Sequence, residues 1–530
     1  MKILTERDFL YIPVASEGEK YEFFIYHDDE VIFHVHVPCG KIREDGSYDF
    51  DYFSPVPVKK WKGMTLSFGG DYPDSFFEAI YQGNEMMPIE NRRSEAKGSC
   101  VTDEENETDG HPIVHFAPKN GWTNDPNGLV FDDGKYHLFY QHNPFGTEWN
   151  NMSWGHAVSH DLLHWEHMPV ALLPDENGTI FSGSGLKNEQ ALLGLPKDAL
   201  LFFYTAAGGS SDSPWSRGKN FHQAIAYSTD HGETLHKYGR EIVPFMVKEN
   251  RDPKVYWHEQ SKGYVMSLYL IDCAYAILRS TDLLHWEMTQ KLQFETANEC
   301  PDLRPVPVQG GKEKWMLFTA SGEYFIGDFD GYRFTNLSAP KFAYKTSLPY
   351  AGQTYNNAPG RVVLMHWLRT KNAGRLFTGV MGLPRELELI PVDGELVLAA
   401  HPVKEWKDVK TTKETLFAVT GKKQASGQLT SPAAVGMKIF MCGAKQLEIN
   451  FCGNMASYDA STGIFTCREE ETMLESGLDV LDIIFDRGIL EVSAKQDTVL
   501  GFWELLKDDG VGEIVVRADD NIQAEAWMVH

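Results

Sequence analysis

The sequence predicts an all-β protein made of a five-bladed β-propeller, a C-terminal β-sandwich and an additional N-terminal β domain. Short apolar strands recur at wide, fairly regular intervals through the middle of the chain, and a turn motif repeats beside them. The two flanking regions also carry strand patterns bounded by turn residues. With 530 residues, the chain is long enough for several domains, each with a core of its own.

Residues 1–97 are expected to form the N-terminal β domain, because apolar and polar residues alternate there as in half-buried strands. Strands are predicted at 22–26 and 31–37, with Asp28-Asp29 as the turn between them. Residues 98–110 are polar and acidic, which predicts a linker. Three arrangements stay open for this domain: it could pack on the propeller, mediate dimerisation or cap the site.

The middle region, residues 111–400, is predicted to be the propeller. Its apolar strands begin about 45 to 65 residues apart, which is the spacing of sheet-sized repeats. The segment 159–166 nearly recurs at 280–287, with a weaker copy at 228–232. The Ser-x-Asp turn and a buried tryptophan would close one hairpin of each unit. Repeated units of this size indicate five four-stranded blades, with a sandwich of chance similarity as the alternative. The five strands are expected at 135–140, 200–205, 264–269, 315–319 and 362–367.

Residues 401–530 are again predicted to be all-β and to form the C-terminal β-sandwich. Strands at 481–487 and 489–492 are expected to pair with each other. A tight turn must join them, and Gly488 supplies the backbone freedom that such a turn needs.

The composition argues against several classes of function. Asp and Glu number 75 against 49 Lys and Arg, and the resulting net charge of −26 opposes binding to nucleic acid or to an anionic membrane. No stretch of 18 apolar residues could span a membrane, and no apolar run near Met1 resembles a signal peptide, so a cytoplasmic location is expected. The seven cysteines form no CxxC pair, which argues against a disulfide framework or a zinc ribbon.

Three carboxylates occur in distinctive local settings. Asp125 lies in the turn-rich segment 121–128 and precedes a proline, which restricts it to an extended backbone. Asp252 also precedes a proline and would be held in the same way, beside the cation of Arg251. Glu299 lies in a loop. Each motif alone also fits an ordinary turn, a surface ion pair or a solvated side chain.

The combination of the three is more informative than any one of them. Each lies near the entry to a different predicted blade, and the loops of a propeller converge on one end of its central channel. Two carboxylates at the right separation can divide glycoside hydrolysis into nucleophilic attack and proton donation. A third charge can orient the sugar and stabilise its oxocarbenium-like transition state.

The spacing of His156, His160, His164 and His167 would suit a metal site only on a helix. The local pattern is a strand followed by a turn, so these side chains would not share a face. Because cleavage of a sugar acetal by two carboxylates requires no metal, we expect neither a metal nor a cofactor in this protein.

These motifs resemble those of glycoside hydrolase family 32, the β-fructofuranosidases, which include invertases, inulinases and levanases. The similarity runs from about His111 to the C-terminus and implies a five-bladed propeller followed by a β-sandwich. Asn298 departs from the family pattern, because many members have an aromatic residue there, and it leaves the identity of the substrate open. The matching stretches follow the family order at 122–128, 141–144, 154–157, 181–184, 251–253, 299–301, 383–387, 486–487 and 491–492.

The resemblance implies a role for each carboxylate. Asp125 would be the nucleophile that attacks the anomeric carbon, and Glu299 would protonate the leaving oxygen and then activate water. Asp252 would hydrogen-bond the ring hydroxyls and stabilise the transition state. The family retains anomeric configuration, so the carboxyl groups of Asp125 and Glu299 should lie about 5–5.5 Å apart. The fructosyl subsite would be lined by Asn124, Gln141, Trp149, Ser182 and Arg251, with Phe181 and Trp367 as apolar walls.

The function implied is a retaining β-fructosidase that hydrolyses terminal non-reducing β-D-fructofuranosyl residues of sucrose or short fructooligosaccharides. Its partner would be a small carbohydrate substrate. Assembly into a homo-oligomer stays open. Within enzymes, the alternatives are an exo-levanase, an exo-inulinase or a fructosyltransferase. Outside enzymes, the alternative is a degenerate sugar-binding propeller. The preference for β-2,1 or β-2,6 linkages does not follow from the sequence.

Overall fold

Strands make up nearly all of the regular structure in this computed structural model, which confirms the all-β prediction. The structure describes residues 1–16, 18–44, 48–84, 99–100, 110–210, 215–409, 414–505 and 510–530. Helices among these residues are short: α1 (Asp74–Ala79), α2 (Lys404–Val409) and the 3₁₀ turn η1 (Lys59–Trp61). Within these ranges, no helix has the length and apolar character needed to cross a membrane.

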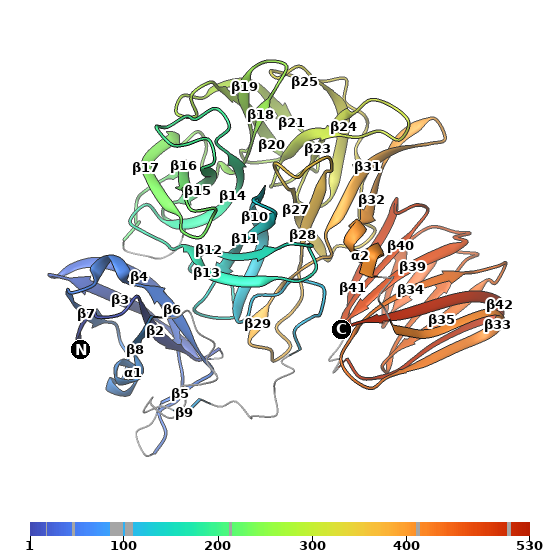
Figure 1. The fold of residues 1–530 in the computed structure, drawn as a ribbon, viewed down its shortest axis with the longest axis horizontal. Helices are drawn as coiled ribbons and strands as arrows, with labels where there is room; N and C mark the ends of the chain where they lie inside the picture. Colours follow the sequence, from blue (N-terminus) through green and yellow to red (C-terminus); the bar gives the residue numbers. More distant parts are fainter. Residues whose placement is uncertain are drawn as a thin grey trace.

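The N-terminal unit contains two main sheets around an aromatic-rich core, with strand orders β1-β7-β3-β4 and β6-β2-β8 (Figure 1). The predicted hairpin is confirmed: a two-residue loop joins β3 to β4, and both Asp28 and Asp29 have positive φ, as such tight turns require. The predicted linker at 98–110 lies mostly outside the described residues, but two of its residues form β9, which pairs with β5. The strands are β1 (Lys2–Leu4), β2 (Phe9–Val14), β3 (Glu19–His27), β4 (Glu30–Cys39), β5 (Asp49–Phe50), β6 (Tyr52–Pro57), β7 (Thr65–Gly69), β8 (Tyr81–Gly83) and β9 (Ser99–Cys100).

The middle unit is a series of five sheets that follow one another along the chain, except that the late strand β29 pairs with β10 of the first sheet. All five strands predicted there are present, as β11, β15, β19, β23 and β28, and each is the second strand of its sheet. The opening strand β10 contacts both β14 of the next sheet and β27 of the last, so the first and last sheets are neighbours (Figure 1).

The bounds of the strands in the middle unit are β10 (Gly121–Asp132), β11 (Lys135–Asn143), β12 (Ser153–Ser159), β13 (Glu166–Leu172), β14 (Thr179–Lys187), β15 (Leu200–Ala207), β16 (Phe221–Ser228), β17 (His236–Val243), β18 (Arg251–His258), β19 (Gly263–Tyr269), β20 (Ala274–Ser280), β21 (Glu287–Gln293), β22 (Asp302–Val306), β23 (Lys314–Phe318), β24 (Glu323–Phe329), β25 (Phe334–Thr335), β26 (Lys341–Phe342), β27 (Pro349–Thr354), β28 (Val363–Leu368), β29 (Phe377–Thr378), β30 (Val380–Met381), β31 (Arg385–Val392) and β32 (Glu395–Pro402).

The repeated Ser-x-Asp motif closes a hairpin, as predicted. The backbone N–H of Leu162 donates to the hydroxyl of Ser159, and the 280–287 copy repeats the bond at the same length, 2.8 Å. These turns join β12 to β13 and β20 to β21, so the histidine run at 156–167 spans a strand, a turn and a strand rather than a helix. The expectation of a buried tryptophan is wrong. The leucine that directly follows the Ser-x-Asp turn is fully buried in both copies, whereas the tryptophan is only partly covered.

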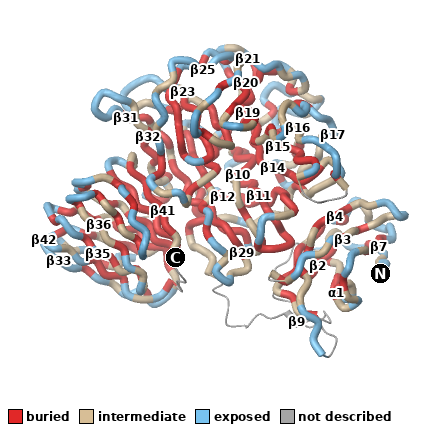
Figure 2. The backbone as a smooth tube through the Cα atoms, turned by 180° about the vertical axis from the view of Figure 1, so that it is seen from behind, coloured by how far each residue is buried: buried red, intermediate tan, exposed pale blue. Residues whose placement is uncertain are grey.

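The C-terminal unit is one curved ten-stranded sheet that encloses its own apolar core (Figure 2). The predicted hairpin joins β39 to β40 through Arg487 and Gly488, both at positive φ. The strands are β33 (Glu414–Leu429), β34 (Ala434–Phe440), β35 (Gln446–Phe451), β36 (Asn454–Asp459), β37 (Ile464–Cys467), β38 (Glu470–Met473), β39 (Val480–Asp486), β40 (Ile489–Ala494), β41 (Val499–Glu504) and β42 (Gly512–Val529).

A buried charge cluster joins the middle and C-terminal units. The ring nitrogens of His115 lie 2.8 Å from a carboxylate oxygen of Asp486 and 3.1 Å from one of Glu491, and Arg385 donates to Glu491 at 2.5 Å. Burial alone would lower the pKa of His115, but its hydrogen bonds to the two carboxylates raise it to about 9. The stretches at 383–387, 486–487 and 491–492 therefore contribute side chains to the contact between the middle and C-terminal units.

The N-terminal unit packs on the middle unit, which is one of the three arrangements left open by the sequence. Phe145 is fully buried in the N-terminal aromatic core, with its ring centroid 5.9 Å from that of Phe33. The side chain of Asn151 accepts from the backbone N–H of His36 and donates to its carbonyl, each at 2.8 Å. Both contacts hold the segment that follows β11.

Candidate active site

Asp125 lies in the strand β10, extended as its following proline predicts. The pairing of β10 with β11 shifts register between Thr123 and Pro126, and such irregularities commonly re-aim side chains next to active sites. The carboxylate of Asp125 accepts hydrogen bonds from the Ser182 hydroxyl at 2.6 Å and from the Asn124 amide at 3.0 Å. Asp125 is only partly buried, so a ligand can approach it.

Asp252 lies at the start of β18, where the expected extended backbone is wrong. Its φ is +62°, although a proline follows, and a non-glycine residue held in this region indicates backbone strain of the kind found at functional sites. The backbone N–H of Asp252 donates to the hydroxyl of Thr205 at 3.2 Å, and its carboxylate accepts from the backbone N–H of Cys300 at 3.1 Å. These two hydrogen bonds hold the strained backbone of Asp252 in place.

Glu299 lies in the loop before β22, and both it and Cys300 have positive φ, 49° and 42°. One oxygen of its carboxylate accepts from the guanidinium of Arg251 at 2.5 Å. The other accepts from the hydroxyl of Tyr350, also at 2.5 Å. Two donors from different sheets therefore orient the side chain that the sequence singles out as the acid.

The three carboxylates converge, as a closed ring of sheets would require. The ligand atoms of Asp125, Asp252 and Cys300 all lie within 4.8 Å of one another, and the thiol of Cys300 is 3.6 Å from both carboxylates. The guanidinium of Arg251, which binds Glu299, also lies 3.8 Å from Asp252. The site thus holds three acidic groups, two of them beside one cation.

The electrostatics of the site raise the pKa values of two of its carboxyl groups, those of Asp125 and Asp252. Burial raises the pKa of Asp125, and the charge of Glu299 acts in the same direction, against the hydrogen bond from Ser182. Burial also raises the pKa of Asp252, to about 7. Arg251 opposes that rise, while the charges of Asp125 and Glu299 add to it.

The predicted subsite residues fall into two groups. Asn124, Ser182 and Arg251 contact the carboxylates directly. Gln141 does not: it is buried, and its amide donates to the carbonyl of Ile180 at 2.9 Å, which fixes the backbone just before Phe181.

The predicted aromatic residues lie in two ring clusters. Trp149 is 47% exposed, and its ring centroid is 6.1 Å from that of Phe181. Trp367 packs edge-on against Trp122, at 5.8 Å, and against Tyr350, at 6.5 Å. The indole of Trp122 also donates to Asn124 at 2.8 Å, which connects the second cluster to Asp125.

Two residues at the site lack a predicted role. Cys300 follows Glu299 within the matching stretch 299–301, but the sequence attaches no role to it. Tyr350 has no such signal, because it lies far along the chain from Glu299 in an unremarkable strand, and only the packing of the sheets brings its hydroxyl to the carboxylate.

Removing the charge of Asp252 should make the fold more stable at high pH. The pKa of Asp252 in the folded protein, about 7, lies above the roughly 3.9 of an unfolded Asp. The contribution of this residue to the free energy of unfolding is therefore fully present below about pH 4 and is lost as the pH rises towards 7. Asp252→Asn escapes this loss. We expect its melting temperature to exceed that of the wild type by a few degrees at pH 8 and to converge with it at pH 4. Thermal unfolding at pH 4, 6 and 8 measures this, and a variant that melts lower at pH 8 contradicts it.

Comparison with known proteins places these features in a family. Levanase from Bacillus subtilis is 35% identical over 338 residues, an alignment that covers 58% of this chain and 49% of the levanase. The extracellular exo-inulinase inuE from Aspergillus niger is 31% identical over 360 residues, covering 58% of this chain and 67% of that protein. The chain thus spans about half the length of the levanase and two thirds of the exo-inulinase.

Solved structures share the fold. Exo-inulinase from Aspergillus awamori has a TM-score of 0.69 at 24% identity, covering 79% of this chain and 98% of that one. A glycoside hydrolase family 32 protein from Bifidobacterium adolescentis has a TM-score of 0.66 at 19% identity and covers 99% of this chain, including the N-terminal unit. The sequence model described as "Glycosyl hydrolases family 32 N-terminal domain" matches residues 115–402. Because this match covers more than half of the sequence, the chain belongs to glycoside hydrolase family 32.

Proposed function

We propose that this protein is a retaining β-fructosidase that hydrolyses terminal non-reducing β-D-fructofuranosyl residues of sucrose or short fructooligosaccharides. The observation that carries the proposal is the convergence of three carboxylates from separate sheets and loops: Asp252 lies close to Asp125, and the guanidinium of Arg251 lies beside both Asp252 and Glu299. Relatives named levanase, exo-inulinase and invertase support it. A β-fructofuranosidase from Schwanniomyces occidentalis, which shares the fold, has been solved with fructosyl-erythritol bound.

In the proposed reaction, Asp125 attacks the anomeric carbon while Glu299 gives a proton to the leaving oxygen, and a fructosyl ester forms on Asp125. Glu299 then takes a proton from water, whose oxygen attacks the same carbon and releases Asp125. Asp252 and Arg251 orient the sugar hydroxyls and balance the charge that develops on the ring. A separation of about 5–5.5 Å between the carboxyl groups of Asp125 and Glu299 stays a prediction of this scheme.

We further infer that the five sheets of the middle unit are the blades of one five-bladed propeller. The contacts of β10 with both β14 and β27 support a closed ring, in which the start of each sheet lies near the axis. The three carboxylates come from β10, from β18 and from the loop before β22, near the starts of the first, third and fourth sheets. The domain boundaries at 97, 110 and 400 stay predictions, as do the cytoplasmic location and a homo-oligomeric state.

A substrate panel tests the proposal against its alternatives. Sucrose, kestose, inulin, levan and levanbiose are incubated with the protein, and products are followed over time. We expect free fructose as the first product, with kcat/KM on sucrose or kestose at least about tenfold above that on either polymer. Higher efficiency on levan or inulin would indicate an exo-levanase or exo-inulinase. Longer oligosaccharides at high sucrose would indicate a fructosyltransferase. Binding of a β-fructoside without hydrolysis would indicate a sugar-binding propeller.

A further inference from the structure

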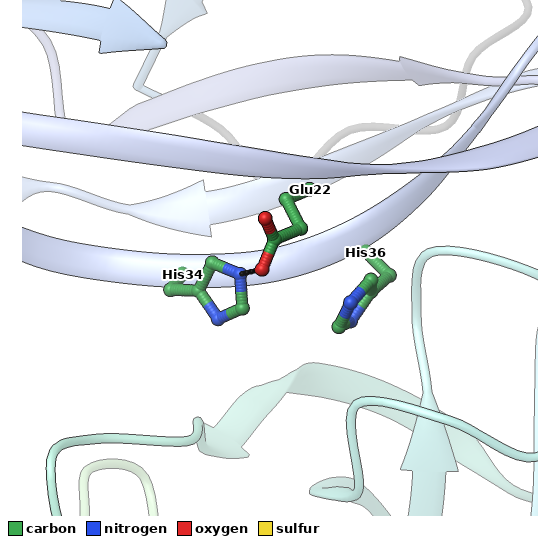
Figure 3. Close-up of side chains that lie close together, drawn as sticks. All are labelled: Glu22, His34 and His36. Carbon is green, nitrogen blue, oxygen red and sulfur yellow. Dashed lines mark ion pairs between the residues drawn. The ribbon is translucent and has the colours of Figure 1, made fainter. Parts of the chain in front are cut away.

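Two histidines and a glutamate gather on one face of the N-terminal unit. His34 and His36 are two residues apart on β4, so their side chains point to the same face of the sheet. In the antiparallel register, Glu22 of β3 lies directly opposite His36. One ligand atom from each residue lies within 4.8 Å of the other two, and Figure 3 shows the carboxylate between the two imidazole rings.

The spacing of these groups suits a shared cation better than it suits a direct bond. Nε2 of His34 lies 3.4 Å from a carboxylate oxygen of Glu22, longer than a good N–H···O hydrogen bond. Two ligand atoms bound to one tetrahedral zinc at about 2.0–2.1 Å stand about 3.3 Å apart, close to this value. The ligand atom of His36 lies within 4.8 Å of the other two, so its side chain would have to move closer to bind the same ion.

The burial of the cluster also fits an ion site with one open side. His34 is almost fully buried, 3% exposed, and the ring of Phe24 covers it with a centroid distance of 4.5 Å. Glu22 has a side chain that is 47% exposed, which gives an ion a path from solvent. The two imidazole rings are 5.3 Å apart and nearly perpendicular, so they do not stack on each other.

A small cavity adjoins the two histidines at the junction with the middle unit. Its volume is about 10 Å³, which is roughly the space for one water molecule. His34 and His36 form one wall, and Asn151, Asp175, Thr179 and Trp215 are among the residues of the other. A water there has polar partners on both sides, so it could complete the coordination shell of an ion.

We propose that Glu22, His34 and His36 bind one divalent transition-metal ion of the zinc class, with a water from the adjoining cavity as a further ligand. Two imidazoles and one carboxylate are donors that zinc and its neighbours prefer, whereas calcium and magnesium select oxygen ligands. The bound ion would fasten β3 to β4 where the backbone of His36 is hydrogen-bonded to Asn151. It would thereby stabilise the attachment of the N-terminal unit, with no part in the reaction.

Titration of the chelator-treated full-length protein with ZnCl₂ tests the proposal. We expect one equivalent to bind with a Kd on the order of 1 μM or tighter, and the melting temperature to rise with zinc concentration. Glu22→Gln and His36→Gln each remove one ligand at positions that are not fully buried, so the fold should persist. Each should weaken zinc binding at least about tenfold and remove the zinc-dependent rise in melting temperature.

Two control variants make the assignment specific. His285→Gln alters an exposed histidine that pairs with Asp282, at 2.6 Å, and should leave the zinc affinity unchanged. Cys300→Ser alters the other described cluster of metal-binding groups, that of Asp125 and Asp252, and should also leave it unchanged. Loss of zinc binding in Cys300→Ser with retention in Glu22→Gln would overturn the proposal. Absence of stoichiometric binding at 100 μM zinc would overturn it as well.

Discussion

Asp125→Asn is expected to abolish the release of fructose from sucrose and kestose while the protein stays folded. The amide has the shape of the carboxylate but no anionic oxygen to attack the anomeric carbon, so the first chemical step loses its nucleophile. Loss of a nucleophile in an enzyme that uses a covalent intermediate lowers kcat by about 10⁴-fold or more. Fructose release under saturating sucrose, measured with enough enzyme to detect that residual rate, provides the test.

A second carboxylate on the same strand supplies a matched control. Asp132 is also in β10 and buried, but it pairs with Lys187 at 2.6 Å and with His231 at 2.8 Å, away from the site. Asp132→Asn breaks these ion pairs, so we expect a lower melting temperature and an almost unchanged kcat. Asp125→Asn should instead lose kcat and keep or raise its melting temperature. A neutral amide is easier to bury than a carboxylate whose pKa is raised by burial. Turnover by Asp125→Asn within about 100-fold of wild type would exclude Asp125 as the nucleophile.

The part of the site that the sequence predicts depends on local chemistry. Asp125 is recognisable because its neighbours are turn residues and a proline that fix the backbone within a few positions. Asp252 has the same local signal, yet its φ of +62° follows from bonds to Thr205 and Cys300, which are distant along the chain. Tyr350 has no local signal at all. Local sequence patterns do not predict the conformation or position of residues that are held by tertiary contacts alone.

The N-terminal unit illustrates the same limit through strand register. The turn at Asp28-Asp29 predicts the hairpin, but continuing its tight register would place Glu22 opposite Val35. An irregularity between Ile25 and Tyr26 shifts the pairing by one residue and brings Glu22 opposite His36 instead. A one-residue shift moves a side chain to the other face of a sheet, so the proposed metal site depends on a bulge that no sequence pattern indicates.

The acid role of Glu299 predicts a split between substrates with poor and good leaving groups. Glu299→Ala should lower kcat/KM for sucrose by about 10²–10⁴-fold, because the departing sugar oxygen needs a proton to leave. An aryl β-fructofuranoside with a p-nitrophenolate leaving group needs little protonation, so its fructosyl transfer to Asp125 should fall far less. Hydrolysis of the intermediate also uses Glu299, so the aryl substrate should show a burst of nitrophenol followed by slow turnover. Stopped-flow absorbance at 400 nm would resolve the two phases.

A neighbouring carboxylate separates loss of the acid from loss of charge near the arginine. Glu249 also bonds to Arg251, at 3.3 Å, but it is not hydrogen-bonded to Tyr350 and does not belong to the convergent set. Glu249→Ala removes one negative charge beside the same guanidinium, so any purely electrostatic effect should change both substrates by the same factor. Only Glu299→Ala should change their ratio. If Glu299→Ala reduced both substrates equally, with no burst, its carboxylate would be positioning Arg251 rather than delivering the proton.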